Sequence, residues 1–350
     1  MFYKKNPNFS KFFSLLKNNY YIYLNNKNSN FPYELKNINI NFKNNLIISD
    51  NIYILSDVSF FSLDFGGNIL FSKFHNFRRP RLKIFNNKYL VYDVGGFEYK
   101  IENNSKILNK CKLKNRIISC DISENVYGVL TESDNYLAKL TIFENNANNE
   151  IYKYYFAENF ISEMAINEEN VACCGFNILE GKLKSFIYFL DLKSENYKYF
   201  FEVEENFLFY IKIFSNNNLV ALGDKSLIVI DTKTGLKKEI IFKKRTLTCF
   251  KFVKDSGILI SLLVGQTCEI LFIDKNGNIS FEIKTQEKIL DLSFKSKRIA
   301  VLLNNKILIY NTSGKISKTV ELNVCPQKIE LLSKNNLLLF YESKIEKILL

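Results

Sequence analysis

The amino-acid sequence predicts an all-β protein, a β-propeller of four-stranded antiparallel blades. Three observations support this prediction: short apolar runs typical of strands, polar turns that recur at the period of one blade, and an aromatic-rich composition with no Pro/Gly/Ser-rich linker. We expect eight blades, with seven as the alternative if residues 42–77 are too irregular to form a full sheet.

The clearest repeat unit runs from Gln286 to Leu322. Its four apolar runs predict strands at 289–294, 299–303, 306–310 and 316–322. Runs rich in Ile, Leu, Val and Tyr that are bounded by Asn, Ser and Gly are typical of strands joined by hairpin turns. One such unit is therefore one blade.

Two series of turns repeat along the chain at intervals of roughly 40 residues, the period of a four-stranded blade. Turns between the first and second strands are expected near Asn45, Asn87, Glu124, Glu168, Asn216, Asp255, Ser296 and Asn335. Turns between the third and fourth strands are expected at Gly66-Gly67, Asn103-Asn104, Asn148-Asn149, Glu195-Asn196, Thr234-Gly235, Asn276-Gly277 and Ser313-Gly314. The second series is one member shorter, so the last blade lacks a fourth strand of its own.

The end of the chain bears on how the ring closes. Residues 343–350 are expected as the third strand of the last sheet, which leaves an unpaired edge that exposes backbone donors and acceptors. An N-terminal segment would supply the missing outer strand, and the candidates are residues 20–24 and 33–40. We therefore divide the chain into an N-terminal amphipathic or extension segment, 1–30, and a single propeller domain, 31–350.

The extension carries Phe9, Phe12, Phe13 and Leu16 at helical spacing among lysines, which predicts a short basic amphipathic helix. This segment is expected either to cap the ring or to be a frayed chain end, and contact with a membrane surface is the alternative. No apolar run here approaches the roughly 18 residues needed to span a bilayer, and no signal-peptide core precedes a small-residue cleavage site. As written, the chain carries no export signal.

A resemblance to a known family rests on three segments. They are RPRLKIFNNKYLVYDVGGFEY from Arg79 to Tyr99, with a tight turn at Gly95-Gly96, VYGVLTESDNYLAKLTIF from Val126 to Phe143, and NFISEMAINEENVACCG from Asn159 to Gly175. They resemble a family of propeller-like proteins from clostridia and related bacteria that is described only as a domain of unknown function. The resemblance implies a single N-terminal transmembrane helix and an outward-facing domain, and it transfers no catalytic residue. This chain departs from that pattern because it lacks the helix, so its location stays open between envelope and cytoplasm.

Few residues predict chemistry. The seven cysteines form no C-x-x-C pair, and most, including Cys173-Cys174, lie in apolar runs and are interpreted as buried thiols. His75 is the sole histidine and is expected at the surface or in a loop rather than as a general base. The turn Thr131–Asp134 could bind a cation, but a solvated turn is the preferred interpretation. We expect no metal, no cofactor and no enzyme.

Charge supplies the remaining signal. The chain has 48 Lys and Arg against 36 Asp and Glu, a formal net charge of +12. In an up-and-down blade the links between blades share one face, and nine cations are expected in those links: Arg78, Arg79, Arg81, Lys112, Lys114, Arg116, Lys243, Lys244 and Arg245. Such a face could meet an anionic lipid, polymer or acidic protein, although a generally basic surface that aids solubility explains it as well.

Three hypotheses follow for function. The first is a non-enzymatic scaffold, a monomer with a protein or cell-envelope partner. The second is an enzyme with its site in the central channel, recognisable by inward polar groups with perturbed pKa values. The third is a basic surface that binds an anionic membrane or polymer; nucleic acid is disfavoured because no binding module is present.

Overall fold

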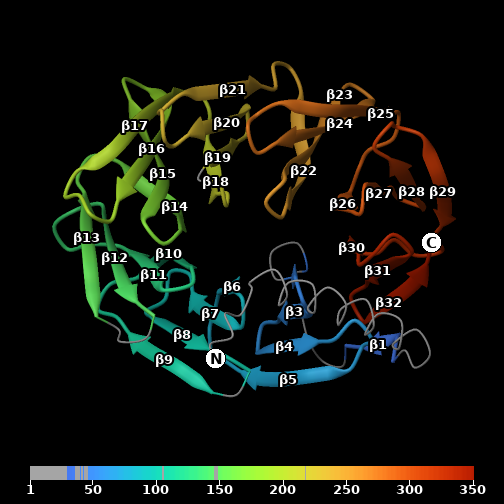
Figure 1. Ribbon diagram of the computed structural model, residues 1–350, viewed down its shortest axis with the longest axis horizontal. Coiled ribbons are helices and arrows are strands. Elements are labelled where there is room, and N and C mark those ends of the chain that lie inside the picture. The colour runs from blue at the N-terminus through green and yellow to red at the C-terminus, as the bar shows by residue number, and fades with distance from the viewer. Residues whose placement is uncertain are drawn as a thin grey trace, which may run out of the picture.

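The computed structural model describes residues 30–35, 40, 42, 46–104, 106–145, 149–216 and 218–350. Figure 1 shows four-stranded sheets arranged in a ring around a central axis. In every sheet except the one that joins the two chain ends, the first strand along the chain is innermost and the last is outermost. All strand pairs are antiparallel, and the predicted eight-bladed propeller is confirmed.

Seven blades are each built from four consecutive strands. Blades 1 to 4 comprise β2 (Leu46–Ile48), β3 (Ile52–Leu55), β4 (Ser59–Leu63) and β5 (Ile69–Phe74); β6 (Pro80–Phe85), β7 (Lys88–Asp93), β8 (Glu98–Glu102) and β9 (Ile107–Lys112); β10 (Ile117–Ile122), β11 (Val126–Thr131), β12 (Ala138–Glu144) and β13 (Glu150–Phe156); β14 (Phe160–Ile166), β15 (Asn170–Leu179), β16 (Lys182–Asp191) and β17 (Tyr197–Glu204). Blades 5 to 7 comprise β18 (Leu208–Ile213), β19 (Asn218–Gly223), β20 (Ser226–Asp231) and β21 (Lys237–Ile241); β22 (Thr246–Val253), β23 (Gly257–Val264), β24 (Thr267–Asp274) and β25 (Ile279–Thr285); β26 (Asp291–Lys295), β27 (Arg298–Leu302), β28 (Lys306–Asn311) and β29 (Ile316–Glu321).

Blade 8 joins the two ends of the chain. Its inner three strands are β30 (Lys328–Leu331), β31 (Asn336–Phe340) and β32 (Lys344–Leu349), and its outer strand is β1 (Tyr33–Glu34). Tyr33 lies opposite Ile345, and the Leu35 amide donates a hydrogen bond to the Ser343 carbonyl at 2.7 Å. Closure by an N-terminal strand at 33–40 is therefore confirmed over two residues, whereas the other candidate, 20–24, and the predicted helix lie outside the described residues.

The core is divided among the interfaces between blades. Each apolar cluster joins two neighbouring sheets, because a blade buries its two faces against the next blade and the previous one. The cluster at the seam packs Phe340 and Ile345 of blade 8 against Ile54 and Phe61 of blade 1, together with Leu35. The closing segment is thus held by packing as well as by backbone pairing.

One expected turn is misplaced. We predicted the first turn of blade 1 near Asn45, but the hairpin of β2 and β3 turns at residues 49–51. There the Asp50 carboxylate accepts hydrogen bonds from the Ser49 hydroxyl, at 2.6 Å, and from the Tyr53 hydroxyl, at 2.9 Å. These side-chain contacts stabilise a turn that lies a few residues after Asn44-Asn45, the pair that suggested the turn in the sequence.

The antiparallel order creates two distinct faces. We call the face that carries the links between blades and the second-to-third-strand turns the link face, and the opposite one the turn face. Within the described residues no helix has the length and hydropathy that spanning a membrane requires.

Candidate functional site

The nine predicted cations lie at three places along the links. Arg78 and Arg79 are exposed in the link that follows β5, and Lys243 and Lys244 are exposed in the link that follows β21. Lys114 and Arg116 are exposed in the link between β9 and β10. Three placements differ from the sequence prediction: Arg81 lies within β6 and Lys112 within β9, and Arg245 is half-buried.

Two of these cations have local counter-charges. Lys114 contacts Asp134 at 2.5 Å, and Arg245 contacts Glu269 at 2.8 Å. The hydrogen bond from Lys114 lowers the pKa of Asp134, and the hydrogen bond from Arg245 lowers the pKa of Glu269. Asp134, at the turn considered for a cation, is thus engaged by Lys114 and also by the Asn115 amide at 2.8 Å. No metal-ligand cluster of three or more His, Cys, Asp or Glu occurs among the described residues.

Exposed aromatic side chains accompany the cations on the link face of blades 2 to 4. Phe97, Tyr136, Tyr155 and Phe160 are between 40% and 51% exposed. The Arg116 guanidinium lies 5.9 Å from the centre of the Phe97 ring, and the rings of Tyr136 and Tyr155 are 4.9 Å apart. We call Phe97, Arg116, Tyr136, Tyr155 and Phe160 the link-face patch.

A pocket opens on the same face between blades 4 and 5. It has a volume of about 280 Å³ and is lined by Gly181, Lys182, Leu183, Glu205, Asp224 and Lys225. It adjoins Phe207, whose amide donates to the Asp224 carboxylate at 2.7 Å and whose ring lies 5.3 Å from that of Phe176. Phe176 in turn stacks on Phe160 at 6.0 Å, so an aromatic row connects the patch to the pocket.

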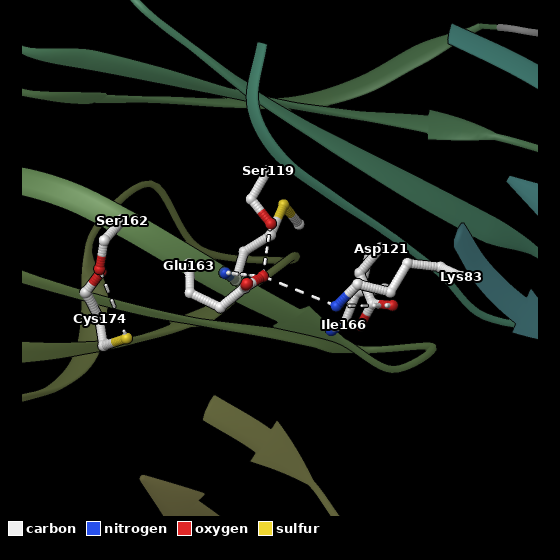
Figure 2. A network of polar contacts seen from close by, with 8 residues as sticks. Lys83, Ser119, Asp121, Ser162, Glu163, Ile166 and Cys174 are labelled. Carbon is white, nitrogen blue, oxygen red and sulfur yellow. Dashed lines mark hydrogen bonds and ion pairs between the residues drawn. The ribbon is translucent and has the colours of Figure 1, made fainter. Parts of the chain in front are cut away.

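A second group of polar residues lies on the inner strands, around the ring axis. The Lys83 ammonium of blade 2 lies 3.9 Å from Asp121 of blade 3 and 3.6 Å from Glu163 of blade 4 (Figure 2). The Ser119 hydroxyl and the Met164 amide also donate to Glu163, and the Ile166 amide donates to Asp121 at 3.0 Å. One lysine thus bridges three blades, which only groups near the axis can do.

The opposite side of the axis repeats this arrangement with different residues. Lys251 of blade 6 contacts Glu330 of blade 8 at 2.5 Å, across blade 7. Asp291 of blade 7 accepts the Ile329 amide at 2.9 Å, and the Ser293 hydroxyl accepts the Leu331 amide at 2.9 Å. As with Asp121, a side chain of one blade satisfies a free N–H on the inner edge of the next.

We define the axial cluster as Lys83, Asp121, Glu163, Lys212, Lys251, Asp291, Lys295, Lys328 and Glu330, and burial affects the pKa of several of its members. Desolvation raises the pKa of Asp121 and Asp291, because the charged carboxylate is disfavoured inside the ring. Desolvation lowers the pKa of Lys212, Lys295 and Lys328 for the same reason. Burial would also lower the pKa of Lys83, but the attraction of Glu163 and Asp121 outweighs it, and the pKa lies well above the usual value.

Sequence reasoning missed both the aromatic patch and the axial cluster. A recurrent signal was present for the cluster: a charged residue interrupts the apolar first strand of most blades, as Lys83 does in RLKIF and Glu163 in ISEMAI. In β10, β14, β18 and β22 a register shift follows the first or second paired residue and changes the direction of the side chains after it.

The residues screened for redox or acid–base chemistry are structural. Cys173 and Cys174 are buried free thiols, and burial raises the pKa of Cys174 to about 12, so this thiol resists ionisation. His75 lies in the loop that follows the outer strand β5, as expected, but its side chain is buried rather than at the surface: it stacks on Phe77 at 5.5 Å and contacts the Ser56 carbonyl at 3.2 Å. Burial lowers its pKa.

Comparison with known proteins decides the family. The model of DUF5711, a family of unknown function, matches residues 19–350. The chain belongs to the DUF5711 family. A search of curated protein sequences finds no relative of this DUF5711 chain.

Solved structures that resemble this DUF5711 protein share its fold at low sequence identity. The computationally designed Ika8 protein superimposes with a TM-score of 0.66 at 12% identity, covering 91% of this chain and 98% of the designed one. BamB from Moraxella catarrhalis gives a TM-score of 0.55 at 13% identity, covering 91% and 99%. AztD from Citrobacter koseri gives 0.56 at 12% identity, covering 82% and 88%. Identities this low establish the propeller fold alone.

Proposed function

We propose that this DUF5711 protein is a non-enzymatic scaffold that binds a protein partner through the link face of blades 2 to 4. The observation that carries the proposal is the link-face patch, in which exposed aromatic rings lie beside an exposed arginine. Tyr, Phe and Arg are enriched where proteins bind one another, and Tyr and Arg supply much of the binding energy there.

The exposure of these side chains has a cost that binding would remove. Four aromatic side chains keep between 40% and 51% of their surface in water. Covering apolar surface contributes about 25 cal/mol per Å². The pocket between blades 4 and 5 extends the surface with two lysines and two carboxylates, which could pair with polar groups at the rim of an interface.

Site-specific photo-crosslinking in the organism that makes the protein tests this proposal. A photoreactive amino acid replaces Tyr136 on the link face or, as a control, Leu236, which is 71% exposed at a turn on the opposite face. We expect one discrete crosslinked protein from position 136 and none from position 236, and its loss when Phe97→Ser and Arg116→Ser are added. Equal crosslinking from both faces would contradict the proposal.

A second candidate is that the basic links bind an anionic membrane or polymer. It is favoured because Arg78, Arg79 and Arg116 are exposed and form no ion pair in the described part of the chain. Carboxylates such as Glu132 and Asp134 are interspersed on the same face, so the attraction would be local to these links.

The remaining expectations are also proposals. The resemblance described above implies an origin in clostridia or related bacteria and an envelope location. The enzyme hypothesis requires inward-facing polar groups with perturbed pKa values in the central channel. The axial cluster meets that criterion, but the Ser119 hydroxyl that donates to Glu163 is buried, so we assign no catalytic role to the cluster.

A further inference from the structure

The most exposed large apolar side chain in the described part of the chain lies at the rim of the link face. Phe74, the last residue of β5, is 80% exposed, and β5 is the outer strand of blade 1 (Figure 1). Val58, in the turn between β3 and β4, is 45% exposed and precedes Ser59, the residue paired with Phe74. A single exposed apolar residue needs no explanation, so the charges around Phe74 decide what it contacts.

Two exposed arginines follow Phe74 in the link between β5 and β6. Arg78 and Arg79 form no ion pair within the described residues. Their Cα atoms lie within about 14 to 18 Å of the Phe74 Cα atom, because four or five residues cannot span more. Asp57, in the turn between β3 and β4, is exposed, while Asp93 is half-buried and accepts the Arg79 amide at 2.7 Å. Two exposed cations therefore outnumber one exposed carboxylate.

Buried side chains hold this link in place between its exposed residues. The His75 amide donates to the Val58 carbonyl at 3.0 Å, so the link is fixed to the neighbouring turn. The Phe77 amide donates to His75 Nδ1 at 3.3 Å, and both of these rings are buried. The hydrogen bond from the Arg79 amide to Asp93 fixes the next part of the link. Because the backbone is already ordered, binding through the arginines would restrict only their side chains.

We propose that Val58, Phe74, Arg78 and Arg79 dock on an anionic lipid bilayer, with Phe74 inserted at the headgroup boundary and the two arginines on lipid phosphates. We call these four residues the blade 1–2 corner. The proposal rests on the second candidate function above, the attraction of the basic links to an anionic surface, and adds an apolar contact to it.

A bilayer accounts for both kinds of side chain at this corner. Phenylalanine beside basic residues is typical of surfaces that lie in the membrane interface, with the ring at the boundary between headgroups and acyl chains. Each Lys or Arg near an anionic membrane surface strengthens binding about fivefold. A soluble polyanion would engage Arg78 and Arg79 equally well, but it has no apolar layer to cover Phe74.

A single tryptophan tests the insertion directly, because the chain contains none. Phe74→Trp keeps an aromatic ring at the corner, and Leu236→Trp, at a position that is 71% exposed on the turn face, is the matched control. With vesicles of phosphatidylcholine and phosphatidylserine we expect the emission of Phe74→Trp to shift to shorter wavelength and to be quenched by brominated lipid. The emission of Leu236→Trp should not change. Vesicle binding without a change at position 74 would overturn the proposal.

Two further variants separate insertion from charge. Phe74→Ser should weaken binding to the same vesicles at least threefold and leave binding to polyphosphate unchanged, whereas Arg78→Ser/Arg79→Ser should weaken vesicle binding at least tenfold. Leu236→Ser, which removes another exposed apolar side chain, should bind like the parent.

The outcomes distinguish this proposal from the function on which it rests. If Phe74→Ser binds vesicles like the parent while the arginine variant does not, insertion is wrong and the attraction of the basic links stands. A parent chain that binds neither the vesicles nor polyphosphate would overturn both. Absence of vesicle binding together with a protein crosslinked to a photoreactive residue at position 74 would assign the corner to a protein partner and overturn the lipid assignment.

Discussion

The same residue type has opposite environments at two points near the axis. Lys83 lies between Asp121 and Glu163, and their attraction raises its pKa. Lys295 faces Lys251 and Lys254 with only Glu330 in its favour, and burial together with those lysines lowers its pKa. Lys83 therefore stabilises the fold as a cation, whereas Lys295 weakens it as a cation.

This difference predicts the pH dependence of stability. The folded-state pKa of Lys295 lies below the unfolded value of about 10.4, so folding favours its neutral form. Its penalty is present at neutral pH and disappears as the pH rises through the folded pKa toward the unfolded value. Lys295→Met should raise the urea midpoint at pH 7 and flatten the gain in stability between pH 7 and pH 10, measured in chloride buffer. Lys297→Met is the exposed control, and a lower midpoint for Lys295→Met would contradict the prediction.

Lys83 gives the opposite prediction. Lys83→Met leaves Asp121 and Glu163 without their cation, and removal of one partner from a largely buried ion pair costs about 3 kcal/mol. Because the lysine is 25% exposed, we expect somewhat less in urea unfolding at pH 7. Lys106→Met, at an exposed turn, should change the free energy of unfolding by no more than about 0.5 kcal/mol. Equal changes in the free energy of unfolding for Lys83→Met and Lys106→Met would show that the contacts of Lys83 with Asp121 and Glu163 do not stabilise the ring.

At the scale of elements, the shortest strand has the largest topological role. β1 pairs over two residues with β32, and Leu35 adds a backbone hydrogen bond and a buried side chain just beyond it. The free edges of the inner strands are not covered by another strand. Instead, side chains of the preceding blade, such as Asp121 and Ser293, accept hydrogen bonds from some of their backbone N–H groups.

Substitutions at Leu35 separate backbone pairing from packing at the seam. Leu35→Ala loses burial, whereas Leu35→Pro also removes the N–H that donates to Ser343. We expect both to lower the melting temperature, with Leu35→Pro lower and prone to aggregate because the edge of blade 8 opens. Identical melting of the two variants would show that this hydrogen bond does not hold the seam.

At the scale of the whole molecule, the net charge of +12 is not spread as one basic face. Arg78 and Arg79 are exposed near the start of the ring, while Lys114 and Arg245 are paired with carboxylates. Attraction to an anionic surface should therefore depend on particular links rather than on total charge.

The charge prediction compares two triple variants. Arg78→Ser/Arg79→Ser/Arg81→Ser should reduce binding to vesicles containing phosphatidylserine, and binding of the parent should weaken as salt shortens the Debye length below about 8 Å. Lys233→Ser/Lys315→Ser/Lys334→Ser removes the same charge from the turn face and should bind like the parent. Equal loss of vesicle binding in both variants would show that binding depends on net charge and not on the position of the arginines.

Features of the structure that depend on residues close together in the sequence could be predicted, and features that depend on distant residues could not. Turn residues such as Thr234-Gly235 and Asn276-Gly277 impose their conformation over a few positions, so the blade period and the blade count could be predicted. Closure could be predicted because a missing strand has few possible donors. Lys83, Asp121 and Glu163 are brought together only by the curvature of the ring, and Tyr136 and Tyr155 only by the blade's own pairing, so neither group could be selected from sequence spacing.

The pairing of β1 with β32 also sets an order of events during biosynthesis. About 310 residues separate β1 from its partner β32, and at about 5 to 20 residues per second a ribosome needs on the order of 15 to 60 s to make them. The ring therefore stays open while the blades between these two strands are being translated. The early blades must tolerate an uncovered face during that time. A nascent chain released before β32 would carry an unclosed seam, a distinctive mark that quality-control proteases could recognise.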